Sequence, residues 1–418
     1  MQMKKQTLWL GLELYKISSK RWMSGEAARR YAAVWGNGDF GRLGSGSLDS
    51  QWKPRPLLSS AFHHQSLVSI ACGGAHTLVL TDTGRVYAAG LNDFGQLGVS
   101  DNIAYSMEPL EVSGLQKEIV QISAGYYHSC AITVDGELYM WGKNSNGQLG
   151  LGKKAEKVVP APTKVECLNG ITIKTIALAS EHSVAVTGEG EALSWGEGSG
   201  RLGHGHELSF WGFSRSTSEY TPRLIKQLEG VKVRNVAAGL LHSACIDENG
   251  CVFVFGEGIV DEMGSGKAKD ARTLSMMSKL PFSKEVACGG YHICVVTIGG
   301  ELYAWGSNDN GCLGIGSITS LHSPERVEGP FSRSPVDKIS CGWKHTAAIS
   351  EGNIFTWGWG GSHGTFSEDE YSSGGQLGHG SDVDRIMPAL VDFEKNVKAL
   401  EVSCGFNHTG AILEYTGA

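Results

Sequence analysis

The sequence predicts an all-β fold, a seven-bladed β-propeller of four-stranded blades, and two repeated marks carry this prediction. An aromatic or small residue followed by Gly returns seven times at intervals of 50 to 60 residues, from Trp35-Gly36 to Trp357-Gly358. A histidine at the end of a small-Gly-x-x-His pattern also occurs once in each unit, with Ala179 in place of the Gly in one of them, at His76, His128, His182, His242, His292, His345 and His408. A period of this length is typical of radially repeated sheets, and two independent marks agree on seven copies.

Each unit has the pattern of four short strands. In the clearest copy, apolar residues predict strands over 67–72, 77–81 and 86–89, with an Asp82-Thr83-Gly84 turn between the last two. A longer Gly-rich connection follows and ends near a proline. Sheets of this kind cover the apolar face of their neighbours when they are arranged about an axis, so one ring accounts for the whole of 31–418.

The two ends of the chain predict how the ring closes. The last unit contains His408 and a strand over 410–413 but stops before a third strand, whereas the first strand of the chain, over 31–35, has the pattern of a third strand. We therefore expect the N-terminal strand to complete the last blade, which would remove the free sheet edges of an open ring.

Composition excludes several classes of protein. Gly contributes 58 of 418 residues without a G-X-Y period, and 41% of residues are hydrophobic, so neither a collagen nor a disordered chain is indicated. The net charge is −7, and residues 1–30 hold seven basic but only two acidic side chains, so the body is more acidic still. We expect no nonspecific nucleic-acid binding by this acidic body, because such binding needs clustered positive charge. We also expect no membrane span, because no apolar run is long enough.

Residues 1–30 predict a separate basic, amphipathic segment. Leu8, Leu12 and Tyr15 recur at helical spacing among lysines, and Arg21-Trp22-Met23-Ser24 is similar to a processing site. A mitochondrial presequence fits this pattern, whereas a secretory signal would need an apolar run that Gly11 and Glu13 interrupt. The alternative is a tail that only precedes the fold, which would leave the protein in the nucleus or cytosol.

The histidines and cysteines favour structural roles. One histidine per blade is spread around the ring, so the seven cannot converge on one ion, and we expect each ring to satisfy backbone groups. No Cys-x-x-Cys pair occurs, so the sequence indicates neither zinc nor disulfides, and we expect no metal, no cofactor and no catalytic residues. At the position before the repeat Gly, two blades carry Ala and four carry a cysteine, which indicates that the position takes a small buried residue. The four cysteines are Cys72, Cys288, Cys341 and Cys404.

The repeat motifs resemble those of the regulator of chromosome condensation family over 31–418. Two motifs show the resemblance, Trp-Gly-x-Asn-x-x-Gly-Gln-Leu-Gly over 141–150 and His-Thr-x-x-hydrophobic at His345. The resemblance implies a seven-bladed propeller. It is greatest to the branch of a plant UV-B receptor, which has Gly-Trp-Arg-His-Thr in three successive blades. Here only 342–346 is similar, so the tryptophan cluster is absent and we do not expect photoreception.

The resemblance implies two kinds of function. The founding family member exchanges guanine nucleotides on the Ran GTPase with a wedge that follows a Trp-Gly step, but here 141–147 is the uninterrupted repeat. We therefore expect a noncatalytic scaffold for protein, or ribonucleoprotein, partners, and exchange on another small GTPase is the alternative. Mitochondrial members of the family are associated with gene expression, RNA processing or ribosome assembly, which makes these the expected processes.

Partner-binding residues are expected where blades depart from the repeat, because loops tolerate insertion while packed strands do not. Three long connections, over 204–220, 257–277 and 361–374, are aromatic, basic and acidic in turn, although neutral drift could equally explain each of them. With the turn at 343–344, they supply the candidates Phe210, Trp211, Phe213, Arg215, Lys267, Lys269, Arg272, Trp343, Lys344, Glu368, Asp369 and Glu370.

Overall fold

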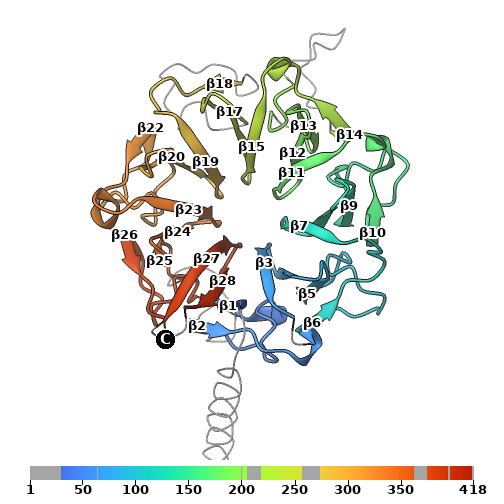
Figure 1. The fold of residues 1–418 in the computed structure, drawn as a ribbon, viewed down its shortest axis with the longest axis horizontal. Coiled ribbons are helices and arrows are strands. Elements are labelled where there is room, and N and C mark those ends of the chain that lie inside the picture. The colour runs from blue at the N-terminus through green and yellow to red at the C-terminus, as the bar shows by residue number, and fades with distance from the viewer. Residues whose placement is uncertain are drawn as a thin grey trace, which may run out of the picture.

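The computed structural model of the chain describes residues 30–63, 65–198, 200–204, 218–256, 274–361, 374–393 and 396–416. In these residues, 28 strands form seven four-stranded antiparallel sheets. The sheets stand as blades around a central axis, with one edge strand of each blade innermost (Figure 1). The predicted seven-bladed propeller is confirmed.

The blades are numbered along the chain, and the strands of each run from the axis outwards. They are β3 (Leu67–Cys72), β4 (His76–Thr81), β5 (Val86–Leu91) and β6 (Tyr105–Glu111) in blade 1; β7 (Ile119–Ala124), β8 (His128–Thr133), β9 (Leu138–Lys143) and β10 (Val158–Lys164) in blade 2; β11 (Ile173–Leu178), β12 (His182–Thr187), β13 (Ala192–Gly196) and β14 (Glu219–Leu224) in blade 3; β15 (Val233–Ala238), β16 (His242–Asp247), β17 (Val252–Gly256) and β18 (Ser275–Met276) in blade 4; β19 (Ser283–Cys288), β20 (His292–Thr297), β21 (Leu302–Gly306) and β22 (Leu321–Arg326) in blade 5; β23 (Val336–Cys341), β24 (His345–Ser350), β25 (Asn353–Gly358) and β26 (Arg385–Leu390) in blade 6; β27 (Val397–Cys404), β28 (His408–Tyr415), β1 (Arg30–Gly36) and β2 (Gln51–Pro56) in blade 7. Short 3-10 helices lie in the connections, at η1 (Asp39–Gly41), η2 (Ser60–Phe62), η3 (Glu166–Leu168), η4 (Lys226–Leu228) and η5 (Gly329–Ser332).

The two ends of the described chain meet in blade 7. Strand β1 pairs with β28 along its whole length, from Arg30 opposite Glu414 to Gly36 opposite His408. Strand β2 then pairs with the other edge of β1, so the N-terminal part of the chain supplies two strands of this blade rather than one. The predicted closure is confirmed, and of the expected N-terminal segment only Arg30 belongs to the described residues.

The two sequence marks are partners in the sheet. In every blade the repeat histidine, at the start of its strand, lies directly opposite the Gly of the aromatic-Gly step on the next strand, as His76 does with Gly90 and Gly36 with His408. Gly36 has a φ of +111°, and a Cβ at this position would lie 2.6 Å from the His408 Cα. The repeat therefore needs Gly here for both conformation and space.

A recurring set of hydrogen bonds joins neighbouring blades, and blades 1 and 2 show it in full. The His76 Nε2 lies 2.8 Å from the Ser129 Oγ of blade 2, and this hydroxyl donates to the carbonyl oxygen of Gln96 at 2.8 Å. The same carbonyl accepts the Trp141 Nε1–H at 2.9 Å. Since the hydroxyl proton goes to the carbonyl, the imidazole Nε2 carries the hydrogen that it donates to Ser129. We call this set of bonds the interblade lock.

The histidine bond of the lock recurs around the ring, in the pairs His182–Ser243, His292–Thr346, His345–Thr409 and His408–Thr77. The partner is a side-chain hydroxyl of the next blade, whereas the sequence predicted that backbone groups would satisfy both ring nitrogens. That prediction was wrong, because the imidazole sits at the interface of two blades. Within the described part of the chain, the buried Nδ1 atoms of several of these rings have no hydrogen-bond partner, as in His76 and His345.

The histidine bond of the lock is missing at two interfaces. Between blades 2 and 3, the ring nitrogens of His128 have no hydrogen-bond partner among the described residues. Between blades 4 and 5, more of the lock is missing. Ile293 occupies the position of the hydroxyl residue, and the ring nitrogens of His242 and the Trp305 Nε1 have no hydrogen-bond partner among the described residues. Of the basic connection over 257–277, residues 257–273 lie outside those residues. In the described part of the chain, this interface is therefore held mainly by apolar packing.

Tryptophans of the aromatic-Gly step fill the space between blades. Trp141 of blade 2 packs in one apolar cluster with Leu78 and Leu80 of blade 1, and its side chain is fully buried. The side chains of Trp35, Trp195, Trp305 and Trp357 are fully buried as well. Because a buried aromatic side chain removes about 150–250 Å² from water, these five residues contribute much of the apolar burial that holds neighbouring blades together.

Acidification should destabilise the ring. Burial lowers the pKa of His76, His128, His292 and His345 to about 3, whereas a histidine in the unfolded chain titrates near its ordinary value of 6.5. Below pH 6.5 the unfolded chain therefore binds protons that the folded chain does not. Each such histidine should lower the free energy of unfolding by up to about 1.4 kcal/mol per pH unit between roughly pH 6 and 4, and its contribution is fully present above about pH 6.5.

Urea unfolding at pH 7.5 and 5.5 measures this effect, and a His345→Gln variant should show a shallower pH dependence than the wild type. Glu401, whose pKa burial raises to about 7, acts in the opposite sense, so Glu401→Gln should steepen the dependence. Equal urea midpoints at the two pH values would contradict the expected role of the histidines.

Removal of β1 should open the ring. Deletion of residues 1–36 leaves β28 and β2 without the buried strand that joins them, so we expect a lower melting temperature and aggregation through the exposed edges. Deletion of 1–29 is the matched control, because it leaves every strand of blade 7 in place. Circular dichroism melts and size-exclusion chromatography compare the two, and equal stability of both truncations would contradict the closure argument.

Candidate functional site

The turns that follow the seven inner strands meet around the axis on one face of the ring. Each turn contains the repeat Gly, or Ala179 in blade 3, and leads into the strand of the repeat histidine. The residues of these turns line a central channel with about 100 Å³ of free volume. This volume is below the roughly 300 Å³ of a typical small-molecule pocket, so the side chains around the mouth of the channel form the larger candidate surface.

Three partly exposed aromatic side chains form a cluster at this mouth, which we call the axial aromatic cluster: Tyr126, Trp343 and Phe406. The Trp343 and Phe406 rings are stacked, with centroids 4.2 Å apart and an angle of 11° between their planes. The Tyr126 ring meets Phe406 edge to face at 5.0 Å. Buried Trp359 supports Trp343 from the side, with ring centroids 5.7 Å apart.

A small residue in blade 1 allows the cluster to form. Tyr126 belongs to blade 2 and Phe406 to blade 7, and the equivalent residue of the blade between them is Gly74. A Cβ at Gly74 would lie 2.4 Å from the Tyr126 carbonyl oxygen. The absence of a side chain there lets the two rings approach each other across blade 1.

Cationic side chains border the axial aromatic cluster. The Lys344 Nζ lies 4.6 Å from the centroid of the Trp343 ring, a distance at which a cation is attracted to the face of an indole. On blade 2, the Lys143 Nζ lies 5.5 Å from the Tyr127 ring and 2.7 Å from the Glu181 carboxylate of blade 3. This edge of the face therefore presents both signs of charge.

Arg42 lies beneath the cluster and is buried. Its Nη1 donates to the Gly74 carbonyl oxygen at 3.3 Å, and its Nε donates to the Asp39 carbonyl oxygen at 3.0 Å. Burial lowers the pKa of the guanidinium to about 10, so it stays charged at neutral pH. Burial also raises the pKa of the Tyr126 phenol to about 12, which keeps that ring neutral. The arrangement offers aromatic faces and cations to a partner, a composition suited to binding.

Two of the residues that the sequence proposed for partner binding fall in this region. Trp343 and Lys344 lie together at the mouth of the channel, and the structure adds Tyr126, Phe406 and Lys143 to them. Tyr126, Trp343 and Phe406 each lie two positions before a repeat histidine, so the repeat pattern contains all three. The pattern does not show that the three rings meet at the axis. The remaining candidates lie outside the described residues and stay predictions: Phe210, Trp211, Phe213, Arg215, Lys267, Lys269, Arg272, Glu368, Asp369 and Glu370.

The model of the family described as the RCC1-like domain matches residues 31–411 of the chain. The chain belongs to the RCC1-like family. It lies on the branch of the ultraviolet-B receptor UVR8 of Arabidopsis thaliana, to which it is 34% identical over 364 residues, which are 86% of this chain and 77% of UVR8. The RCC1 domain-containing protein RUG3, mitochondrial, of the same plant is 32% identical over 333 residues, which are 76% of this chain and 72% of RUG3.

Among solved structures, human WBSCR16 superposes with a TM-score of 0.78 at 25% identity. The match covers 93% of this chain and 100% of that one. The superposition therefore extends around the whole ring of that structure.

The stacked pair of the axial aromatic cluster should be energetically coupled. We expect Trp343→Ala and Phe406→Ala to destabilise the chain, and the double variant to lose about 0.5–1.5 kcal/mol less than the sum of the two, because the stack is lost only once. Urea unfolding of the four proteins measures this coupling. As a control, Phe62→Ala, which removes a ring that contacts Tyr87 instead, should add to Trp343→Ala within about 0.5 kcal/mol. Additivity of the Trp343 and Phe406 substitutions would contradict the coupling.

Proposed function

We propose that this RCC1-like propeller is a noncatalytic scaffold that binds a protein partner, alone or within a ribonucleoprotein, at the axial aromatic cluster. One observation supports the proposal above others: Tyr126, Trp343 and Phe406 are partly exposed, the Phe406 ring contacts the other two, and Lys344 lies beside Trp343. Aromatic residues next to cations are enriched where interfaces concentrate their binding energy. Rings that already contact one another also lose less side-chain freedom on binding.

We further propose that the scaffold acts in mitochondrial gene expression, RNA processing or ribosome assembly. The basic, amphipathic character of residues 1–30 supports import, and the relative RUG3 is named as a mitochondrial protein. Among the described residues, no helix combines the length and the apolarity that a bilayer crossing would need. Exchange on a small GTPase in the nucleus or cytosol is the alternative, by analogy with the founding member of the family.

Proximity labelling in living cells tests the partner and the compartment together. A labelling enzyme fused after Ala418 should mark matrix proteins of RNA processing or the ribosome. The combination of Trp343→Ala and Phe406→Ala should reduce enrichment of the direct partner at least about tenfold, because hot-spot residues contribute about 2 kcal/mol or more each. Tyr105→Ala on β6 is the matched control, since it removes a 42% exposed aromatic side chain outside the cluster and should leave enrichment unchanged.

The other outcomes of this experiment are equally specific. A small GTPase together with nuclear transport factors among the labelled proteins would favour exchange and exclude import. Enrichment that survives the double substitution would place partner binding elsewhere on the ring. Deletion of residues 1–23 should move labelling out of the mitochondria, and unchanged labelling would contradict the presequence.

A further inference from the structure

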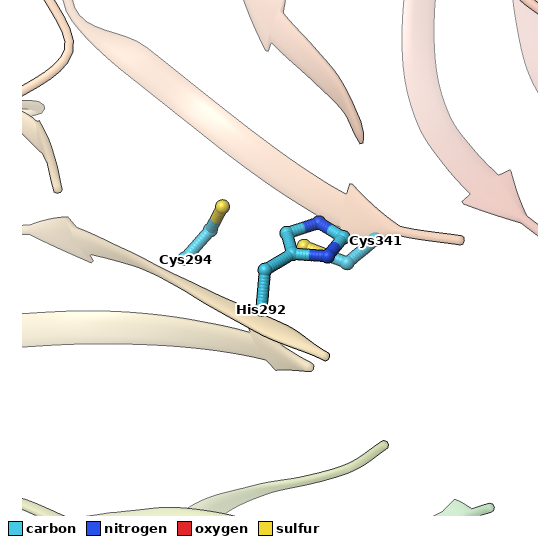
Figure 2. Close-up of side chains that lie close together, drawn as sticks. All are labelled: His292, Cys294 and Cys341. Atoms are coloured by element: carbon cyan, nitrogen blue, oxygen red, sulfur yellow. The ribbon is translucent and has the colours of Figure 1, made fainter. Parts of the chain in front are cut away.

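Three potential metal ligands meet at the interface of blades 5 and 6. His292 and Cys294 lie on β20, and Cys341 ends β23 of the next blade (Figure 2). A ring nitrogen of His292 and the two sulfur atoms all lie within 4.8 Å of one another. Both cysteines are free thiols. The sequence did not indicate this group, because its members come from two blades and have no Cys-x-x-Cys spacing.

The repeat explains why the group occurs at this interface and at no other. Each interface places three positions near one another: the repeat histidine, the residue two positions after it, and the residue before the Gly of the next inner strand. The geometry recurs between blades 7 and 1, where a Cβ at Gly410 would lie 3.1 Å from the Cys72 sulfur. All of these positions are described, and no other interface has a cysteine at both of the positions that accompany the histidine. The residue two after the histidine and the residue before the next Gly are, in the other six interfaces, Leu78 and Ala124, Cys130 and Leu178, Val184 and Ala238, Ala244 and Cys288, Ala347 and Cys404, and Gly410 and Cys72.

The chemistry of the three side chains suits a thiophilic divalent cation. Two thiolates and one neutral imidazole balance the charge of a divalent ion, so the complete site is neutral and can be buried without an unpaired charge. Burial keeps the imidazole neutral and lowers its pKa to about 3. Burial also raises the pKa of the Cys341 thiol well above its usual value, so the ion has to displace the thiol protons when it binds.

The surroundings orient the histidine and leave a route of entry. The His292 Nε2 donates to the Thr346 Oγ1 at 2.9 Å, and this hydroxyl donates to the Cys312 carbonyl oxygen at 2.8 Å. An outer hydrogen bond of this kind holds a ligating imidazole and leaves the lone pair on its second nitrogen. Cys341 is partly exposed and lines the central channel, through which an ion and a water can reach the group.

We propose that His292, Cys294 and Cys341 bind a zinc ion that links blades 5 and 6, with a water from the channel side as the fourth ligand. Zinc takes sulfur and nitrogen ligands in tetrahedral sites, and three protein ligands with a water are one of its common sets. The site is independent of the partner-binding proposal, although Cys341 and Trp343 belong to the same turn.

Zinc and cobalt titrations of the reduced, metal-free full chain test the site. We expect about one zinc ion per chain after desalting, measured by inductively coupled plasma mass spectrometry. Binding of each ion should release about two protons. Cobalt in the same site should give thiolate-to-cobalt absorption in the near ultraviolet. Cys294→Ala and Cys341→Ala should each abolish both signals while the fold persists, because blade 4 carries Ala244 and Ala238 at the corresponding positions.

Matched controls come from the same repeat positions. Cys130→Ala corresponds to Cys294 and Cys72→Ala corresponds to Cys341, and both variants should keep full zinc binding. The absence of stoichiometric zinc uptake by the wild type would overturn the proposal, as would uptake that persists in the Cys294→Ala, Cys341→Ala double variant. If a variant fails to fold, the proton count of the wild type still decides, because binding without release of thiol protons excludes these ligands.

Discussion

The hydrogen bonds from the repeat histidine to the next blade are the interaction on which the remaining structure depends. A neutral imidazole donates to a Ser or Thr hydroxyl, which donates to a turn carbonyl that also accepts a Trp indole, as in His76, Ser129, Gln96 and Trp141. All these groups are buried, and a buried polar group without a partner costs about 1–3 kcal/mol. The histidine recurs in all seven blades, and among the described residues its bond to a hydroxyl of the next blade is made at five of the seven interfaces.

A ring held in this way leaves its variable chemistry at a few defined places. The residues between the repeat Gly and the histidine face the channel mouth and take no part in the lock, so blades 2, 6 and 7 can carry Tyr126, Trp343 and Phe406 there. The position before that Gly accepts different apolar residues, with Cys341 in blade 6, Ala238 in blade 4 and Leu178 in blade 3. A partner-binding face and a metal site can thus be added to one turn without disturbing the packing.

Sequence patterns predicted the candidate site only in part. Trp343 and Lys344 were recognisable because they depart from the repeat, but Phe406 and Tyr126 belong to units far apart in the chain. Their contact depends on ring closure and on the missing side chain at Gly74. The sequence did not predict the partners of the histidines for a similar reason. The hydroxyl belongs to the next blade and follows the histidine by 53 to 64 residues in the four such bonds that do not join the chain ends.

The sequence by itself determined the number of blades, their strands and the way in which the ring closes, because these follow from a local pattern that is repeated along the chain. It also determined that the repeat tryptophans are core residues, since the same position recurs in an apolar setting. Only the tertiary structure decided which side chains meet across blades: the partners of the lock, the axial aromatic cluster, and the group of His292, Cys294 and Cys341. The physical reason is that packing between blades joins residues one or more periods apart, and the repeat pattern of a single unit holds no information about its neighbour.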